Sequence, residues 1–180
     1  MIGALYSINR PHTDNIKSGL KLWEIRKSKP NLPVPFPAFI YETKRNGGCG
    51  KVIGEFICDR IYKTIMFDKQ ANMYLWGNDF IRKETYLSEK EINEYGKGKP
   101  LYGLHISNLK IYDKPKEIVE FRKPCIDKYE YCQGCIHGLV TIPPDEEEYA
   151  FYHGGNYEFF DTHCMNYLTR PPQLWCYVEI

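Results

Sequence analysis

Three charged residues stand close together near the start of the chain, in the order Lys21, Glu24 and Arg26. Residues 22–26 alternate apolar and polar side chains, which is the period-2 pattern of a half-buried strand. Glu24 and Arg26 are two residues apart, so they point to the same face of that strand. Lys21 precedes the strand, where a loop can direct a mobile cation to the same face.

These side chains have the chemistry of a nucleotide-binding site. An arginine fork can hold a phosphate or a base carbonyl through two parallel hydrogen bonds. A carboxylate can accept a hydrogen bond from an exocyclic amine, as it does from cytosine. The alternative is that Glu24 and Arg26 form a solvated ion-pair network on the surface of the strand.

The elements around this segment are mostly strands joined by short connections. Residues 11–18 form a short helix that ends at Gly19, a C-terminal capping residue, and Ser88 and Glu91 have the spacing of a capping box. A connector with four prolines covers residues 30–37, and residues 61–83 allow no assignment. The predicted strands cover residues 3–8, 22–26, 38–42, 51–59, 101–112 and 174–180, with a second helix at 88–95, a turn at 113–115 and one helical turn at 116–120. The pattern predicts an α+β fold, a small mixed and mostly antiparallel barrel with short helices.

Composition indicates one globular domain over residues 1–180. Apolar residues make up 43% of the chain and charged residues 26%, which is ordinary for a folded domain. The net charge of +1 excludes a strongly basic protein that binds nucleic acid through overall charge, so the positive charge must be local. We find neither a signal peptide nor an apolar run that could span a membrane, and expect a cytoplasmic protein with no membrane partner.

Residues 121–170 differ in character and are predicted to be an irregular insertion. This stretch contains a Cys-x-x-Cys motif, whose spacing lets two thiolates bind one zinc ion. A structural zinc site would explain how so long an irregular segment folds, and free buried thiols are the alternative. The four candidate zinc ligands are Cys125, Cys132, Cys135 and Cys164.

Several segments together resemble the ASCH family of PUA-like barrels. The first is the pattern Gly19-x-Lys21-x-x-Glu24-x-Arg26, flanked by Pro11, Ile16, Lys17 and Pro30. Residues 51–56 resemble the family's central strand, and residues 102–106 followed by 112–115 match a later segment. Residues 170–178 are similar to the ending of ASCH proteins from prophages and Gram-positive bacteria. The resemblance covers residues 1–120 and 170–180.

The resemblance implies a barrel with a ligand cleft beside the short helix, and a module that binds RNA or a modified nucleotide. Such modules are often linked to transcription or translation, in bacteria or their phages. We therefore expect Lys21→Ala and Arg26→Ala to weaken RNA binding with little loss of stability. The expected ligand-binding residues are Ser7, Arg10, Lys21, Glu24, Arg26, Tyr41 and His105, with His12 and Trp76 as further candidates for the cleft.

Two other functions stay open. Some ASCH relatives are amidohydrolases that deacylate cytidine, and others have ribonuclease activity. In a hydrolase Lys21 and Glu24 would be catalytic, but Glu24 stands where the deacylating relatives carry a threonine hydroxyl, and Glu84 matches their glutamate only loosely. The other alternative is a phage-encoded factor that binds a host protein through the aromatic segment 149–160.

Overall fold

Two β-sheets form the frame of the protein in a computed structural model, which describes residues 1–68, 70, 73–76, 83–124 and 167–179. One sheet has five strands in the order β8-β4-β3-β1-β9, and the other has four in the order β2-β7-β5-β6. The strands are β1 (Ile2–Ile8), β2 (Trp23–Arg26), β3 (Phe36–Glu42), β4 (Lys51–Cys58), β5 (Ile61–Asp68), β6 (Met73–Trp76), β7 (Leu101–His105), β8 (Ser107–Lys116) and β9 (Trp175–Glu179).

Neighbouring strands run antiparallel except β1 and β3, which are parallel. The α-helices are α1 (Arg10–Lys17) and α3 (Glu89–Gly96), and the 3-10 helices are η1 (Arg45–Gly47) and η2 (Ile118–Glu120). The predicted α+β fold with a mixed, mostly antiparallel arrangement is confirmed, although the two sheets do not close into one barrel. None of the described helices is both long and apolar enough to span a membrane.

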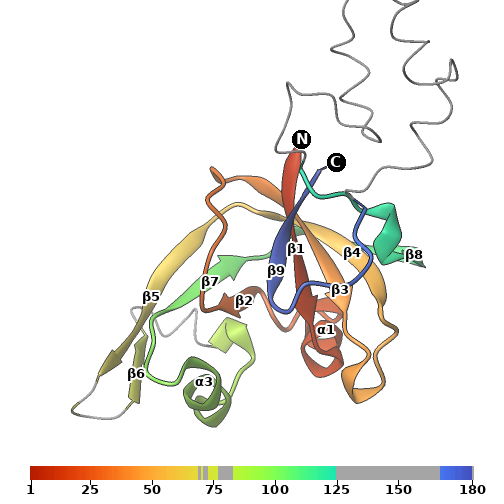
Figure 1. Ribbon diagram of the computed structural model, residues 1–180. Coiled ribbons are helices and arrows are strands. Elements are labelled where there is room, and N and C mark those ends of the chain that lie inside the picture. Colours follow the sequence, from red (N-terminus) through yellow and green to blue (C-terminus); the bar gives the residue numbers. More distant parts are fainter. Residues whose placement is uncertain (69, 71–72, 77–82, 125–166, 180) are drawn as a thin grey trace, which may run out of the picture.

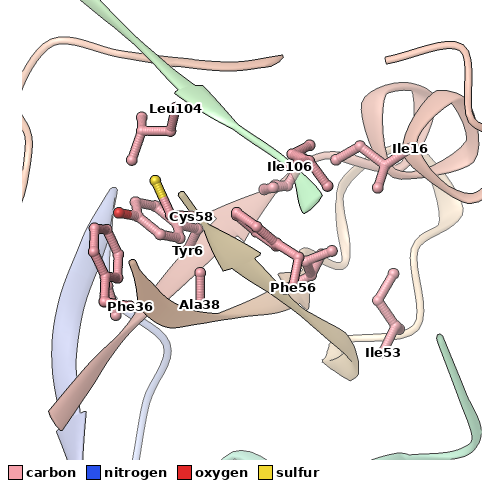
Figure 2. Packing of buried hydrophobic residues seen from close by; sticks show 12 residues of the cluster. Tyr6, Ile16, Phe36, Ala38, Ile53, Phe56, Cys58, Leu104 and Ile106 are labelled. Atoms are coloured by element: carbon pink, nitrogen blue, oxygen red, sulfur yellow. The ribbon is translucent and has the colours of Figure 1, made fainter. Parts of the chain in front are cut away.

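The main core lies on one face of the five-stranded sheet and is covered by α1 and the start of the β7–β8 connection (Figure 2). Alternate residues of β1, namely Ala4, Tyr6 and Ile8, point into it, as period 2 requires. Phe56 from β4 stacks against Tyr6 with ring centroids 6.4 Å apart. A second cluster covers the opposite face of the same sheet, and a third packs α3 on β2 and β7. Both faces of the large sheet are therefore buried.

Helix α1 ends as the sequence predicts and directs the chain into β2. Gly19 has a φ of 75°, the left-handed conformation that glycine adopts without strain. The amide groups of Leu20 and Lys21 both donate to the Asn15 carbonyl at 3.0 Å. This turn leads the chain from α1 through Lys21 to the start of β2. The capping box of α3 is also confirmed, with Ser88 and Glu91 bonded to each other.

The prediction of one long strand over residues 101–112 is wrong. The chain leaves the four-stranded sheet after His105 and joins the five-stranded sheet at Ser107, and the buried Ile106 lies between them. The Ile106 amide donates to the Leu22 carbonyl at 2.9 Å instead of to a regular strand partner. Local sequence does not reveal this change of sheet, because it depends on pairing with distant segments.

The predicted turn at residues 113–115 is also wrong, because β8 continues to Lys116. Its Pro115 lacks an amide hydrogen, but β8 is an edge strand and tolerates that loss. Similarly, β3 begins two residues before the predicted strand and includes Pro37, which pairs with Ile57 of β4. Pairing of β3 with β1 begins only at Ala38, so Pro37 needs no donor on that side.

Candidate functional site

Lys21, Glu24 and Arg26 form one buried ionic network. Lys21 lies just before β2, and Glu24 and Arg26 belong to that strand. The Lys21 Nζ atom lies 3.5 Å from one Glu24 carboxylate oxygen, and the Arg26 Nη2 atom lies 3.0 Å from the other. The predicted shared face of Glu24 and Arg26 is therefore confirmed. The alternative of a solvated surface pair is wrong, because the three residues are only 2%, 7% and 5% exposed.

Burial also corrects the expected role of Lys21 as a mobile cation in a loop. Its Nζ atom donates to the Thr85 carbonyl at 2.8 Å, besides pairing with Glu24. Burial lowers the pKa of Lys21, and the adjacent Glu24 carboxylate opposes that shift. Lys21 is held between two acceptors, so its charge is part of the folded structure. Its removal must therefore disturb folding as well as binding.

Arg26 links the network to two other parts of the chain. Its guanidinium donates to the Ser7 carbonyl at 2.9 Å and to the Leu174 carbonyl at 3.3 Å. It also lies over the Tyr6 ring, 5.4 Å from the centroid. These bonds join β2 to β1 and to the segment before β9. One donor is left over, because the buried Arg26 Nε has no hydrogen-bond partner within the described residues.

The network lies in the wall of a cleft of about 1180 Å³. This exceeds the roughly 300–1,000 Å³ typical of a small-molecule pocket, so the cleft has room for a ligand of nucleotide size. Side chains from β1, α1, β2, the β3–β4 loop, α3 and the segment before β9 contribute. The polar and aromatic residues that line it are Ser7, Asn9, His12, Lys21, Glu24, Arg26, Tyr41, Thr43, Lys44, Arg45, Glu91, Glu94, Tyr95 and Gln173.

Of the seven expected ligand-binding residues, Arg10 and His105 lie outside this cleft. Arg10 donates to the Gly47 carbonyl at 2.7 Å and pairs with Asp14. The His105 Nδ1 atom lies 2.6 Å from Asp59, and its ring packs against Trp23 with centroids 4.7 Å apart. Both residues therefore have structural partners.

His12 does line the cleft, close to the network. Burial lowers its pKa, and the positive charge of Lys21 lowers it further. His12 is therefore neutral at physiological pH, with one ring nitrogen that donates and one that accepts.

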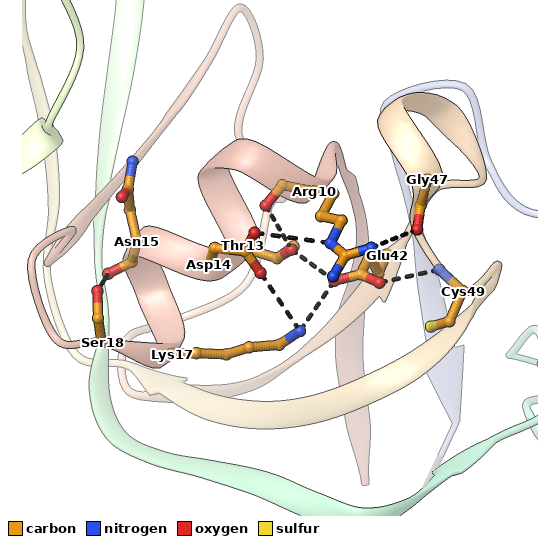
Figure 3. A network of polar contacts seen from close by, with 9 residues as sticks. All are labelled: Arg10, Thr13, Asp14, Asn15, Lys17, Ser18, Glu42, Gly47 and Cys49. Atoms are coloured by element: carbon orange, nitrogen blue, oxygen red, sulfur yellow. Dashed lines mark hydrogen bonds and ion pairs between the residues drawn. The ribbon is translucent and has the colours of Figure 1, made fainter.

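Glu42 fixes the β3–β4 loop, which also lines the cleft, to helix α1 (Figure 3). One carboxylate oxygen accepts from Thr13 at 2.6 Å and from Lys17 at 2.9 Å, and the other accepts from the Cys49 amide at 2.9 Å. Burial alone would raise the pKa of Glu42, but these hydrogen bonds outweigh it and lower the pKa to about 2. These hydrogen bonds fix α1 to the β3–β4 loop, which carries the exposed Lys44 and Arg45.

Sequence reasoning missed eight polar or aromatic residues of the cleft, namely Asn9, Thr43, Lys44, Arg45, Glu91, Glu94, Tyr95 and Gln173. The glycine-rich turn after Arg45 predicted a loop, but nothing local placed that loop beside β2. Glu91 was predicted only as a capping residue of α3. The Tyr95 hydroxyl is buried beside Arg26, and burial raises the pKa of Tyr95 against the lowering effect of the Arg26 guanidinium.

The remaining candidates have other positions. Glu84 accepts a hydrogen bond from the Trp23 indole at 2.9 Å and does not line the cleft. Trp76 ends β6, and its side chain is not among those described. The four predicted zinc ligands, Cys125, Cys132, Cys135 and Cys164, lie outside the described residues, as does segment 149–160. The zinc site therefore stays a prediction. Among the residues that are described, no cluster of three or more histidine, cysteine or acidic side chains could hold a metal ion.

No protein-family model and no curated protein matches this sequence. Solved structures do match its fold. A tyrosine-to-phenylalanine variant of the ASCH protein from Zymomonas mobilis superposes with a TM-score of 0.51 over 64% of this chain and 76% of its own, at 19% identity. A serine-to-alanine variant of the same protein gives 0.51 over 64% and 73%, at 20% identity. The chain thus has the fold of an ASCH protein, in agreement with the resemblance of its sequence.

Proposed function

We propose that this protein is an ASCH-type module that binds single-stranded RNA, or a modified nucleotide, in the cleft beside α1. The observation that carries the proposal is the buried Lys21–Glu24–Arg26 network, which places two cations and one anion in the wall of an open cleft. The network leaves one positive charge uncompensated by its own members. A phosphate supplies the missing negative charge, and a base carbonyl offers the guanidinium a hydrogen-bond acceptor.

The outer part of the cleft supports the same function. Lys44 and Arg45 are exposed on the anchored β3–β4 loop, where they can meet a phosphodiester backbone. Tyr41 and Tyr95 also line the cleft and supply aromatic surface of the kind on which bases stack. The fold class of the solved ASCH structures agrees with this assignment.

Binding fits the geometry better than hydrolysis does. Both Glu24 oxygens are engaged by cations, so this carboxylate is poorly placed to take a proton from water. Glu84, the other candidate acid, is bonded to Trp23 outside the cleft. The role of Glu24 is then to hold Lys21 and Arg26 in place.

Charge reversal at the cleft mouth tests the proposed function without disturbing the buried network. We expect the double variant Lys44→Glu/Arg45→Glu to bind a single-stranded RNA of about eight nucleotides at least about tenfold more weakly than the wild type, because two phosphate contacts become repulsive. Fluorescence anisotropy at two salt concentrations measures the affinity and its salt dependence. The salt dependence should become weaker in the variant.

The matched control is Lys63→Glu/Lys114→Glu, which changes the net charge equally. Both control lysines are exposed and lie outside the cleft, on β5 and on the edge strand β8. The affinity of this control variant for the RNA should stay within about twofold of that of the wild type at moderate salt. Equal weakening in both double variants would show a response to overall charge and would refute a site in the cleft.

A further inference from the structure

His12 lines the cleft with both ring nitrogens available to a ligand. It belongs to α1 and is partly buried. Among the residues that the structure describes, none forms a hydrogen bond with its ring. The ring of His105 is engaged, in contrast, because it contacts Asp59 at 2.6 Å and Arg60 at 3.1 Å. His12 is therefore the described histidine that a ligand in the cleft can use.

Four charged side chains from neighbouring segments act on His12. Lys21 precedes β2, Glu24 and Arg26 belong to β2, and Glu91 belongs to α3. Burial and the charge of Lys21 lower the pKa of His12, and the two carboxylates only partly oppose that effect. In the free protein the imidazole ring is thus kept neutral by its surroundings.

The remaining charged groups leave the cleft with an excess of positive charge. On α1 itself, Arg10 pairs with Asp14, and Lys17 pairs with Glu42. In the cleft wall, the two cations of the β3–β4 loop are joined by one further carboxylate, that of Glu94. The wall therefore carries four cations and three carboxylates while His12 is neutral.

A phosphodiester bound beside His12 reverses this balance. A nearby negative charge favours the protonated form of an imidazole, so the same ring becomes easier to charge once the anion is present. The protonated ring donates from both nitrogens, whereas the neutral ring donates from only one. Binding of the phosphate and uptake of a proton by His12 therefore strengthen each other.

We propose that His12 is a phosphate-binding residue of the cleft, and that it takes up a proton from the solvent when an RNA phosphodiester binds beside the Lys21–Glu24–Arg26 network. This inference rests on the proposed function. It adds a second phosphate position, besides that of Lys44 and Arg45, and a dependence on pH. Affinity should rise as the pH falls from the alkaline side, and should level off below the pKa of His12 in the free protein.

Oligouridine of about eight nucleotides is the probe, because neither its phosphodiesters nor its bases titrate between about pH 5.5 and about pH 8, where histidine does. We expect the wild type to bind it about tenfold more tightly at the lower pH than at the higher one, at constant ionic strength, as measured by fluorescence anisotropy. The side chain of His12→Gln cannot take up a proton, so its affinity should change by about twofold or less over the same range.

His105→Gln is the matched control, because His105 lies outside the cleft. It should keep the pH dependence of the wild type. Calorimetric titration near neutral pH, in two buffers with different ionisation enthalpies, should show proton uptake on binding in the wild type and in His105→Gln but not in His12→Gln.

Equal affinity of the wild type at the two pH values would overturn the inference while the proposed RNA binding stands. A pH dependence that persists in His12→Gln would also overturn it, because the proton would then bind to another group, such as Lys21. If the wild type binds the RNA at neither pH, the proposed function fails and this inference fails with it.

Discussion

Replacing Glu24 by alanine should lower the free energy of unfolding by about 3–5 kcal/mol, because it leaves two buried cations without their shared counter-charge. Lys21 and Arg26 are almost fully buried, and Glu24 is the carboxylate that both contact. Urea denaturation followed by tryptophan fluorescence measures the change. The loss should become smaller as the pH rises, since a deprotonated Lys21 needs no counter-charge.

Glu94→Ala is the control for this experiment. Glu94 is an exposed residue of α3 whose nearest ion-pair partner, Lys90, lies 3.9 Å away on the surface. Its replacement should change stability by no more than about 0.5 kcal/mol. A Glu24→Ala variant as stable as the control would show that the network is solvated, contrary to the buried geometry described above. Because Lys21 and Arg26 are buried, we expect Lys21→Ala and Arg26→Ala to lower stability as well, in contrast to the small loss that the sequence alone predicts.

The second large effect concerns Glu42, whose carboxylate joins α1 to the loop of Lys44 and Arg45. Its pKa is lowered from 4.5 to about 2, so folding favours the ionised form. This contribution is fully present above the unfolded pKa and is lost as the pH falls from about 4.5 toward about 2. At about 1.4 kcal/mol per pKa unit, it amounts to about 3 kcal/mol at neutral pH.

Unfolding free energies of the wild type and Glu42→Gln, measured between neutral pH and about pH 3, check this prediction. The difference between the two proteins should be largest near neutral pH and should shrink in acid. Thr13→Val, which removes one of the bonds to Glu42, should give a smaller difference with the same direction. Parallel pH curves for wild type and Glu42→Gln would contradict the assignment of a strongly bonded carboxylate.

Helices and strands with strong local signals were predictable from the sequence. Gly19 ends α1, the Ser88–Glu91 capping box begins α3, and alternation defines β2 and β4. The hairpin of β5 and β6 and the change of sheet at Ile106 were not, because neither has a local signature. Their geometry is set by pairing with β7 and by burial in the core, which are contacts between distant residues.

The candidate site, too, was predictable only where the signal is local. Period 2 was enough to place Glu24 and Arg26 on one face, but it could not show that this face is buried. Burial results from Thr85, from Leu174 and from Tyr95, which approach β2 from far along the chain. The position of Lys44 and Arg45 in the cleft could not be predicted from local sequence either, because α1 and Glu42 determine where their loop lies.

Photo-crosslinking tests most directly whether RNA occupies the cleft. A cytidine-rich RNA of about eight nucleotides with one central 4-thiouridine can be bound, irradiated and digested, and the linked peptides can be identified by mass spectrometry. We expect crosslinks to peptides that contain Tyr41, Lys44 or Tyr95, and their loss in Lys44→Glu/Arg45→Glu. Crosslinks confined to peptides outside the cleft, such as the one that contains His105, would contradict the account.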